Sequence, residues 1–293
     1  FSIFKPGKET FHGVFLKPFP AGYLEWMTRK IPKGPVTLQQ LTAFRKSAEW
    51  YRDVWTEAIP GDSKDSTYND TTRILAGKVL GLALIQECRI RGVRGLSLQA
   101  GPSVPWTVFF FDKNTNIFGK AASELNTVSA RAGEECVVLY VDTIQEMCGY
   151  LQAFPGWVEI NKMRILVHGS PGNLYVKKNN SFPKITGMGL HTLLDTNNLY
   201  LLGNAGKAFI TDAEIIIMAC NTGRGYEGEE FFKALGHKLL PRGGKITAYR
   251  YSSWGGIASW YHIPNPWASS AYIHYIVKAD GTGYFPVRYS SKP

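Results

Sequence analysis

EIIIMACNTG, residues 214–223, joins a nearly continuous apolar run to a small polar loop. Apolar residues in succession, rather than alternating with polar ones, are typical of a strand buried on both faces, and such strands belong to parallel sheets covered by helices. The stretch therefore predicts a central strand over Glu214–Ala219. Cys220 would follow this strand at its carboxyl end, where the reacting groups of open α/β sheets lie.

Strands and helices alternate on both sides of this run. Further strands are predicted over Trp106–Phe111, Cys136–Val141, Met163–Val167 and Lys245–Tyr249. A helix is predicted over Tyr226–Leu240, and we expect Asp142 to cap another whose inward residues are Ile144, Met147, Cys148 and Leu151. Tyr272–Val277 and Tyr284–Tyr289 flank the turn Asp280-Gly281-Thr282-Gly283 and indicate a hairpin. The pattern predicts an α/β fold whose mostly parallel sheet is flanked by helices.

The first third of the chain has a different pattern. Phe1–Pro35 is dense in proline and glycine, so we expect loops and short strands there. Thr37 and Gln40 form the signature of a helix N-terminus, and a second helix is predicted over Thr71–Arg91. We therefore expect residues 1–103 to be an accessory region of loops and two helices, joined to an α/β domain over residues 104–293 that ends in the hairpin.

The composition is that of a folded chain. Of the 293 residues, 44% are hydrophobic and 19% charged, which provides enough apolar surface for a core. The longest apolar runs fall far short of the ~20 residues that a membrane-spanning helix needs, so we expect a soluble protein without a membrane span. Four cysteines are too few for a disulfide framework, and together with the six histidines they show no metal-binding spacing. Neither a metal nor another cofactor is predicted.

The net charge of +10 points to no particular partner. Lysines and arginines are spread over the whole chain, with no run longer than a pair such as Arg29-Lys30. Nucleic-acid binders usually concentrate such charge on one stripe or arm. We interpret the charge as a solvated cationic surface. Binding of a nucleic acid or another polyanion is the least favoured function, resting only on charge and on the many C-terminal aromatic residues.

A second strand end carries a histidine. The strand that includes Met163–Val167 is followed by His168-Gly169-Ser170-Pro171-Gly172. If this strand and Glu214–Ala219 are neighbours, His168 and Cys220 project into one crevice. An imidazole and the N-terminus of the helix after Cys220 can activate a thiol, and the N–H groups of Gly169 and Cys220 can form an oxyanion hole. Each residue alone is more often structural, but the pair indicates a catalytic dyad.

These strand ends resemble those of the caspase-like (clan CD) cysteine peptidases. The group includes caspases, gingipains, the self-cleaving protease domains of large bacterial toxins and the bacterial CHAT-type proteases, and its signature is a strand ending in His-Gly followed later by one ending in Ala-Cys. This chain has His168-Gly169 and then Ala219-Cys220. The run ACNTGRGYEGEE (219–230) is especially similar to the CHAT-type pattern, and HGSPGNL (168–174) to related bacterial domains. The resemblance covers about residues 136–260.

The resemblance implies a caspase-like fold and a cysteine endopeptidase that cleaves a protein or peptide. His168 would act as general base or acid, and Cys220 would attack the scissile carbonyl. Many members of the group need no third residue to orient the histidine, and we interpret Asp195 and Asp212 as surface carboxylates. The segment after Lys245–Tyr249 would line the substrate pocket, with Arg250, Ser252, Ser253 and Trp254 as its candidate residues. Arg250 would favour an acidic side chain and Trp254 would wall an apolar pocket, although a surface arginine and a packed tryptophan explain both equally well.

The resemblance also implies a cellular compartment. A catalytic thiol at Cys220 requires a reducing environment, so we expect the cytoplasm, or a cytosol into which the chain is delivered as a bacterial effector or toxin module. We expect the other cysteines, Cys88, Cys136 and Cys148, to lie in the core. The alternative is a caspase-like domain without activity that serves a structural or interaction role, with His168 and Cys220 as remnants.

Overall fold

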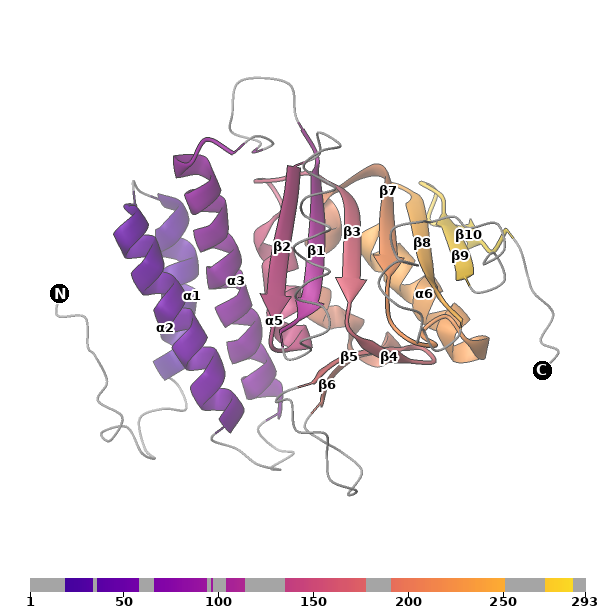
Figure 1. The fold of residues 1–293 in the computed structure, drawn as a ribbon, viewed down its shortest axis with the longest axis horizontal. Coiled ribbons are helices and arrows are strands. Elements are labelled where there is room, and N and C mark those ends of the chain that lie inside the picture. The colour runs from indigo at the N-terminus through magenta and orange to yellow at the C-terminus, as the bar shows by residue number, and fades with distance from the viewer. Residues whose placement is uncertain are drawn as a thin grey trace.

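A seven-stranded sheet forms the centre of the protein (Figure 1). The computed structural model describes residues 19–33, 36–57, 66–93, 96, 104–113, 135–177, 191–250 and 272–286. The strands lie in the order β10 (Gly283–Tyr284), β9 (Tyr272–Val277), β8 (Gly244–Tyr249), β7 (Phe209–Ile217), β3 (Ile160–Leu166), β1 (Trp106–Asp112) and β2 (Glu135–Val141). Every pairing from β2 across to β8 is parallel, whereas β9 and β10 are antiparallel to their neighbours. This confirms the predicted α/β class and the mostly parallel sheet.

Helices cover one face of this sheet. Alternate residues of β1 divide between two apolar clusters: Val108 and Phe110 join the larger one, and Phe109 and Phe111 the smaller one on the opposite face. The described helices contribute only to the larger cluster. They are α1 (Phe19–Lys30), α2 (Leu38–Glu57), α3 (Ser66–Ile90), α5 (Ile144–Ala153) and α6 (Gly225–Leu239), with the 3-10 helices η1 (Ile31–Lys33), η3 (Thr196–Leu202) and η4 (Ala205–Ala208). None of the described helices is long and apolar enough to cross a membrane.

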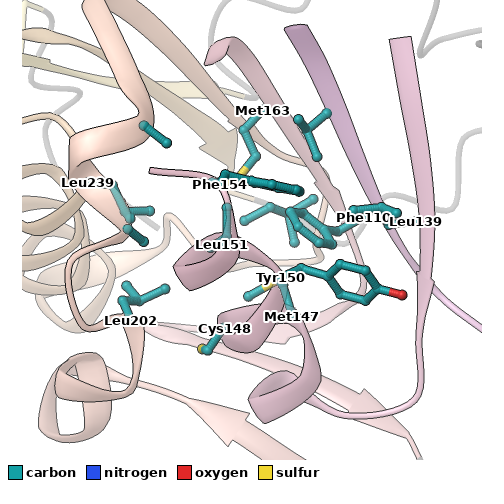
Figure 2. Close-up of a cluster of buried hydrophobic side chains, with 14 of the residues drawn as sticks. Phe110, Leu139, Met147, Cys148, Tyr150, Leu151, Phe154, Met163, Leu202 and Leu239 are labelled. Atoms are coloured by element: carbon teal, nitrogen blue, oxygen red, sulfur yellow. The ribbon is translucent and has the colours of Figure 1, made fainter. Parts of the chain in front are cut away.

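The helix α5 forms the centre of the larger cluster. Figure 2 shows Met147, Leu151 and Phe154 packed between sheet residues such as Phe110 and Met163 and the side chains of Leu202 and Leu239. The four residues predicted to face inward, Ile144, Met147, Cys148 and Leu151, are fully buried. The predicted cap at Asp142 is wrong by one residue, because Thr143 accepts the hydrogen bond from Glu146 N (3.0 Å). The carboxylate of Asp142 pairs instead with Arg52 and Lys113.

The N-terminal region is more helical than predicted. Loops and short strands were expected through Pro35, but α1 and η1 occupy residues 19–33. Pro20 lies in the first turn of α1, where its missing N–H costs nothing, and Leu24, Met27 and Ile31 follow at helical spacing and are fully buried. The predicted start of α2 is confirmed by reciprocal hydrogen bonds between Thr37 and Gln40. The helix α3 begins five residues before the predicted Thr71.

Glycines let α3 and α5 approach at backbone distance. A Cβ atom at Gly149 would overlap the carbonyl oxygen of Ile74 and lie 2.7 Å from Lys78 N and 2.8 Å from the Cα of Gly77. These are backbone atoms, so a larger residue is accommodated only if one helix moves away. The helix α3 is therefore packed tightly against α5, which covers the sheet, whereas the division at residue 103 remains a prediction.

We expect Gly149→Ala to lower the free energy of unfolding by about 1–3 kcal/mol, the usual cost of overpacking. Alanine has a higher helix propensity than glycine by up to about 1 kcal/mol, so propensity alone would make the variant more stable. A loss of stability would therefore show that the overlap with α3 outweighs the gain in propensity. Gly22→Ala in α1, where nothing lies within 4 Å of the new Cβ, is the matched control and should be neutral or stabilising. Denaturant unfolding of both variants measures this; equal stability of the two would contradict the close contact.

Two smaller features differ from expectation in their bounds. The strand β7 begins at Phe209 rather than Glu214, because exposed Thr211 and Asp212 interrupt the apolar pattern of its first half. The C-terminal hairpin is confirmed as β9 paired antiparallel with β10. Its second arm was predicted to run to Tyr289; β10 ends at Tyr284, and residues 287–289 lie outside the described residues.

A second, three-stranded antiparallel sheet lies at the carboxyl edge of the main one (Figure 1). It consists of β4 (His168–Ser170), β5 (Asn173–Lys177) and β6 (His191–Leu194). A two-residue turn, Pro171-Gly172, joins β4 to β5, and the φ of +70° at Gly172 is one that L side chains rarely adopt. The small sheet thus begins with the histidine that the sequence singled out.

Candidate functional site

The strands that precede His168 and Cys220 are neighbours, as the sequence argument required. β3 and β7 are parallel with Ile165 opposite Ile217, and Met218 N donates to Ile165 O (2.8 Å) just beyond the paired residues. His168 and Cys220 each follow three residues after that matched pair. Both side chains are half-buried. The fold therefore brings the two residues to the same edge of the sheet, at its carboxyl end.

The His-Gly segment is packed directly onto the Ala-Cys loop. A Cβ atom at Gly169 would overlap Thr222 Oγ1 and lie 2.8 Å from Ala219 Cβ and 2.9 Å from Cys220 O. Only glycine fits such an approach without displacing the loop. Gly169 is therefore required for a structural reason, since it is the point where the two strand ends meet.

Backbone contacts hold the Cys220 loop on both sides. Thr222 is fully buried; its hydroxyl donates to Asn173 O (3.4 Å), and its carbonyl accepts from Gly172 N (3.1 Å), so the loop is tied to the β4–β5 turn. Gly223 N donates to Tyr249 O (2.9 Å), which ties it to β8. Asn221, directly after Cys220, has a φ of 56°, in the left-handed region that asparagine tolerates. Cys220 thus lies in a tight turn that hydrogen bonds to two neighbouring segments hold in place.

Tyrosines lie on both sides of this turn. The Tyr175 ring stacks on the His168 ring, and the Tyr175 hydroxyl donates to Gly169 O (3.3 Å). At the end of β8, Tyr249 packs against Tyr272, whose hydroxyl donates to that of Tyr249 (3.3 Å). Burial raises the pKa of Tyr175 and of Tyr249, and negative charge at Cys220 raises both further. Cys220 is therefore within electrostatic range of both phenols, which stay protonated at neutral pH.

The candidate pocket residues are described only in part. Arg250 is half-buried and directly follows Tyr249, the last residue of β8. The strand β8 is paired with β7, which precedes Cys220. Ser252, Ser253 and Trp254 lie outside the described residues. A substrate pocket lined by Arg250 and these three residues remains a prediction.

The two aspartates set aside as partners for His168 have other surroundings. Asp195 caps η3, accepting hydrogen bonds from Asn197 N (2.9 Å) and Asn198 N (3.2 Å). It is half-buried, so the expectation of a surface carboxylate holds only in part for it. Asp212 is exposed near the amino end of β7, the end opposite to Cys220. Asp212 is thus the surface carboxylate that we expected.

The other cysteines differ from Cys220 in their surroundings. Cys88 and Cys148 are buried, as predicted; burial raises the pKa of Cys88 to about 11 and also raises that of Cys148, whose thiol lies in the core beside Leu202 (Figure 2). The expectation was wrong for Cys136, which is half-buried because it packs at the edge of the smaller cluster. The described residues contain no group of three side chains that could hold a metal ion.

Sequence reasoning missed three residues of the site: Tyr175, Thr222 and Tyr249. A signal for the first was present, because a two-residue turn at Pro171-Gly172 pairs Ser170 with Asn173 and hence His168 with Tyr175. No comparable signal exists for Thr222 or Tyr249, whose contacts join segments far apart in the chain.

No family model matches the chain, and no curated protein or solved structure matches it. The caspase-like identity of the fold and the activity of the dyad therefore remain proposals.

Proposed function

We propose that the chain is a cysteine endopeptidase with a caspase-like fold and a His168/Cys220 dyad. The observation that carries this proposal is the contact at Gly169, which packs the His-Gly segment against Ala219 and Cys220. A His-Gly strand end meeting an Ala-Cys strand end is the signature on which the resemblance rests, and here the two ends meet in space as well as matching in sequence.

In the proposed reaction, His168 takes the thiol proton of Cys220, and the sulfur attacks the scissile carbonyl carbon of a peptide. The N–H groups of Gly169 and Cys220 stabilise the resulting oxyanion. His168 then gives its proton to the leaving amine, and a thioester to Cys220 is formed. Water, activated by the neutral imidazole, hydrolyses this thioester and restores the thiol.

The surroundings of Cys220 support a reacting thiol over a structural one. Structural thiols in this chain are buried with a raised pKa, as at Cys88 and Cys148. Cys220 is instead half-buried in a turn outside the sheet, held by contacts from Thr222 and Gly223. A preformed loop is what positioning of a nucleophile requires, since small displacements of reacting groups lower rates steeply.

The substrate proposed is a protein or peptide, and the position of Arg250 after β8 favours an acidic residue before the cleaved bond. A reducing compartment follows from the need for a free thiol, and the sequence resemblance favours a bacterial protein that works as an effector or toxin module in a cytosol.

Selective alkylation combined with peptide cleavage tests this proposal. We expect a haloacetamide at neutral pH to modify Cys220 at least about tenfold faster than Cys136, because the proposed imidazole base can take the thiol proton as the sulfur attacks. Peptide mapping by mass spectrometry identifies the modified residue, and a peptide library incubated with the unmodified and the alkylated protein measures cleavage. Equal reactivity of the cysteines with no peptide cut would contradict the peptidase and favour the scaffold role.

A further inference from the structure

Tyr175 lies at the centre of the candidate site although the proposed chemistry does not use it. In the antiparallel β4–β5 pair it is the residue directly opposite His168. Residues opposite each other on one face of a sheet have Cβ atoms about 4.5–5.5 Å apart, so their side chains touch. The hairpin that presents the histidine therefore presents the tyrosine with it.

The contact between the two rings is nearly parallel. The ring centroids of His168 and Tyr175 are 5.8 Å apart and the interplanar angle is 16°. This is an offset stack, within the range in which aromatic pairs attract one another. An imidazole stacked on a fixed ring has fewer rotamers available, so its nitrogen atoms keep one direction.

The tyrosine also reaches the backbone and the nucleophile. Its hydroxyl donates to Gly169 O (3.3 Å), which ties the ring to the residue that contacts the Cys220 loop. The pKa of Tyr175 is raised by burial first and then by negative charge at Cys220. The side chain thus stays a neutral donor at neutral pH, and it lies within electrostatic range of Cys220.

We propose that Tyr175 is a positioning residue, which holds the His168 imidazole and the Gly169 backbone in the arrangement needed for proton transfer from Cys220. This inference rests on the proposed function. It assigns two roles to one side chain: the ring orients the imidazole by stacking, and the hydroxyl holds the backbone of β4.

Substitutions of Tyr175 separate these roles from simple stability. We expect Tyr175→Leu and Tyr175→Met to lower the rate of Cys220 alkylation near pH 7 by roughly 10- to 100-fold, the scale on which misplaced reacting groups lose rate. In peptide cleavage, kcat should fall by a larger factor than the factor by which KM changes. Tyr175→Phe, which keeps the ring, should restore most of the rate. Two ring-free variants are made so that a folding failure of one leaves the comparison intact.

Val176→Ala is the matched structural control. Val176 is the next residue of β5, is fully buried, and belongs to the larger cluster. The Val176→Ala variant should have a lower melting temperature, while its rate of Cys220 alkylation and its kcat stay near those of the wild type. If the alkylation rate and kcat of Tyr175→Leu matched those of the wild type or of Val176→Ala, this inference would be overturned and the proposed peptidase would stand. Wild-type Cys220 that reacts no faster than Cys136 would overturn the peptidase and the inference together.

Discussion

Replacing Cys220 by alanine is expected to lower the rate of peptide cleavage by at least about 10³-fold, because removal of a nucleophile from a catalytic dyad leaves only binding and oxyanion stabilisation. The side chain is half-buried in a turn that Thr222 and Gly223 hold through the backbone, so the fold should persist. Cleavage of the best library peptide, followed over hours, measures the loss, and the circular dichroism spectrum verifies the fold.

The His168→Ala variant and the double variant complete the test. Residues that act as one unit lose activity together, so the double variant should be about as inactive as either single one. Cys136→Ala removes another half-buried thiol, one that packs at the smaller cluster, and should keep wild-type cleavage. Cleavage by Cys220→Ala at the rate of Cys136→Ala would show that another group performs the reaction.

The sequence predicted the part of this site that depends on strand ends. Buried parallel strands have nearly continuous apolar sequences, so His168 and Cys220 could be placed just after two such strands, although β3 ends at Leu166 and β7 at Ile217. Their adjacency was a condition in the sequence argument and is now an observed pairing. The close approach at Gly169 could not be predicted, because the atoms that exclude a side chain there belong to a loop fifty residues further along the chain.

The N-terminal helices were harder to interpret from sequence. Proline in the first turn of α1 resembles a loop signal, although the buried Leu24, Met27 and Ile31 show helical spacing. Asp142 resembles a helix cap for a similar reason: it precedes the helix, but its partner is a residue ninety positions earlier. A local sequence pattern can predict hydrogen bonds between neighbouring residues. It cannot predict that tertiary packing places the Arg52 guanidinium beside Asp142.

Loss of the Arg52 side chain is expected to destabilise the fold strongly. Its guanidinium pairs with Glu146 (3.0 Å) and Asp142 (3.0 Å), and the Arg52 and Glu146 side chains are only 5% and 1% exposed. Removing one partner of a buried pair leaves a charge without compensation and costs about 3–5 kcal/mol. We expect Arg52→Met to lower the free energy of unfolding by about that amount at pH 8, measured by urea denaturation.

The loss should depend on pH with a definite sign. Burial raises the pKa of Glu146 from its ordinary 4.5 to about 7, outweighing the lowering by Arg52. A carboxyl with a raised folded-state pKa stabilises the fold fully below pH 4.5, and this contribution is lost as pH rises through 7. Without Arg52 the pKa rises further. Arg52→Met should therefore be less destabilising at pH 5, where Glu146 is protonated in both proteins, than at pH 8.

Two comparisons make this expectation specific to the buried pair. Arg45 lies on the same helix and pairs with Glu87 (2.9 Å), but its side chain is 46% exposed, so Arg45→Met should cost less than about 1 kcal/mol at either pH. Adding Glu146→Gln to Arg52→Met removes the buried charge and should recover part of the stability at pH 8. If Arg52→Met and Arg45→Met lost equal stability, or the loss did not change with pH, Arg52 would contribute through packing of its stem and not through its charge.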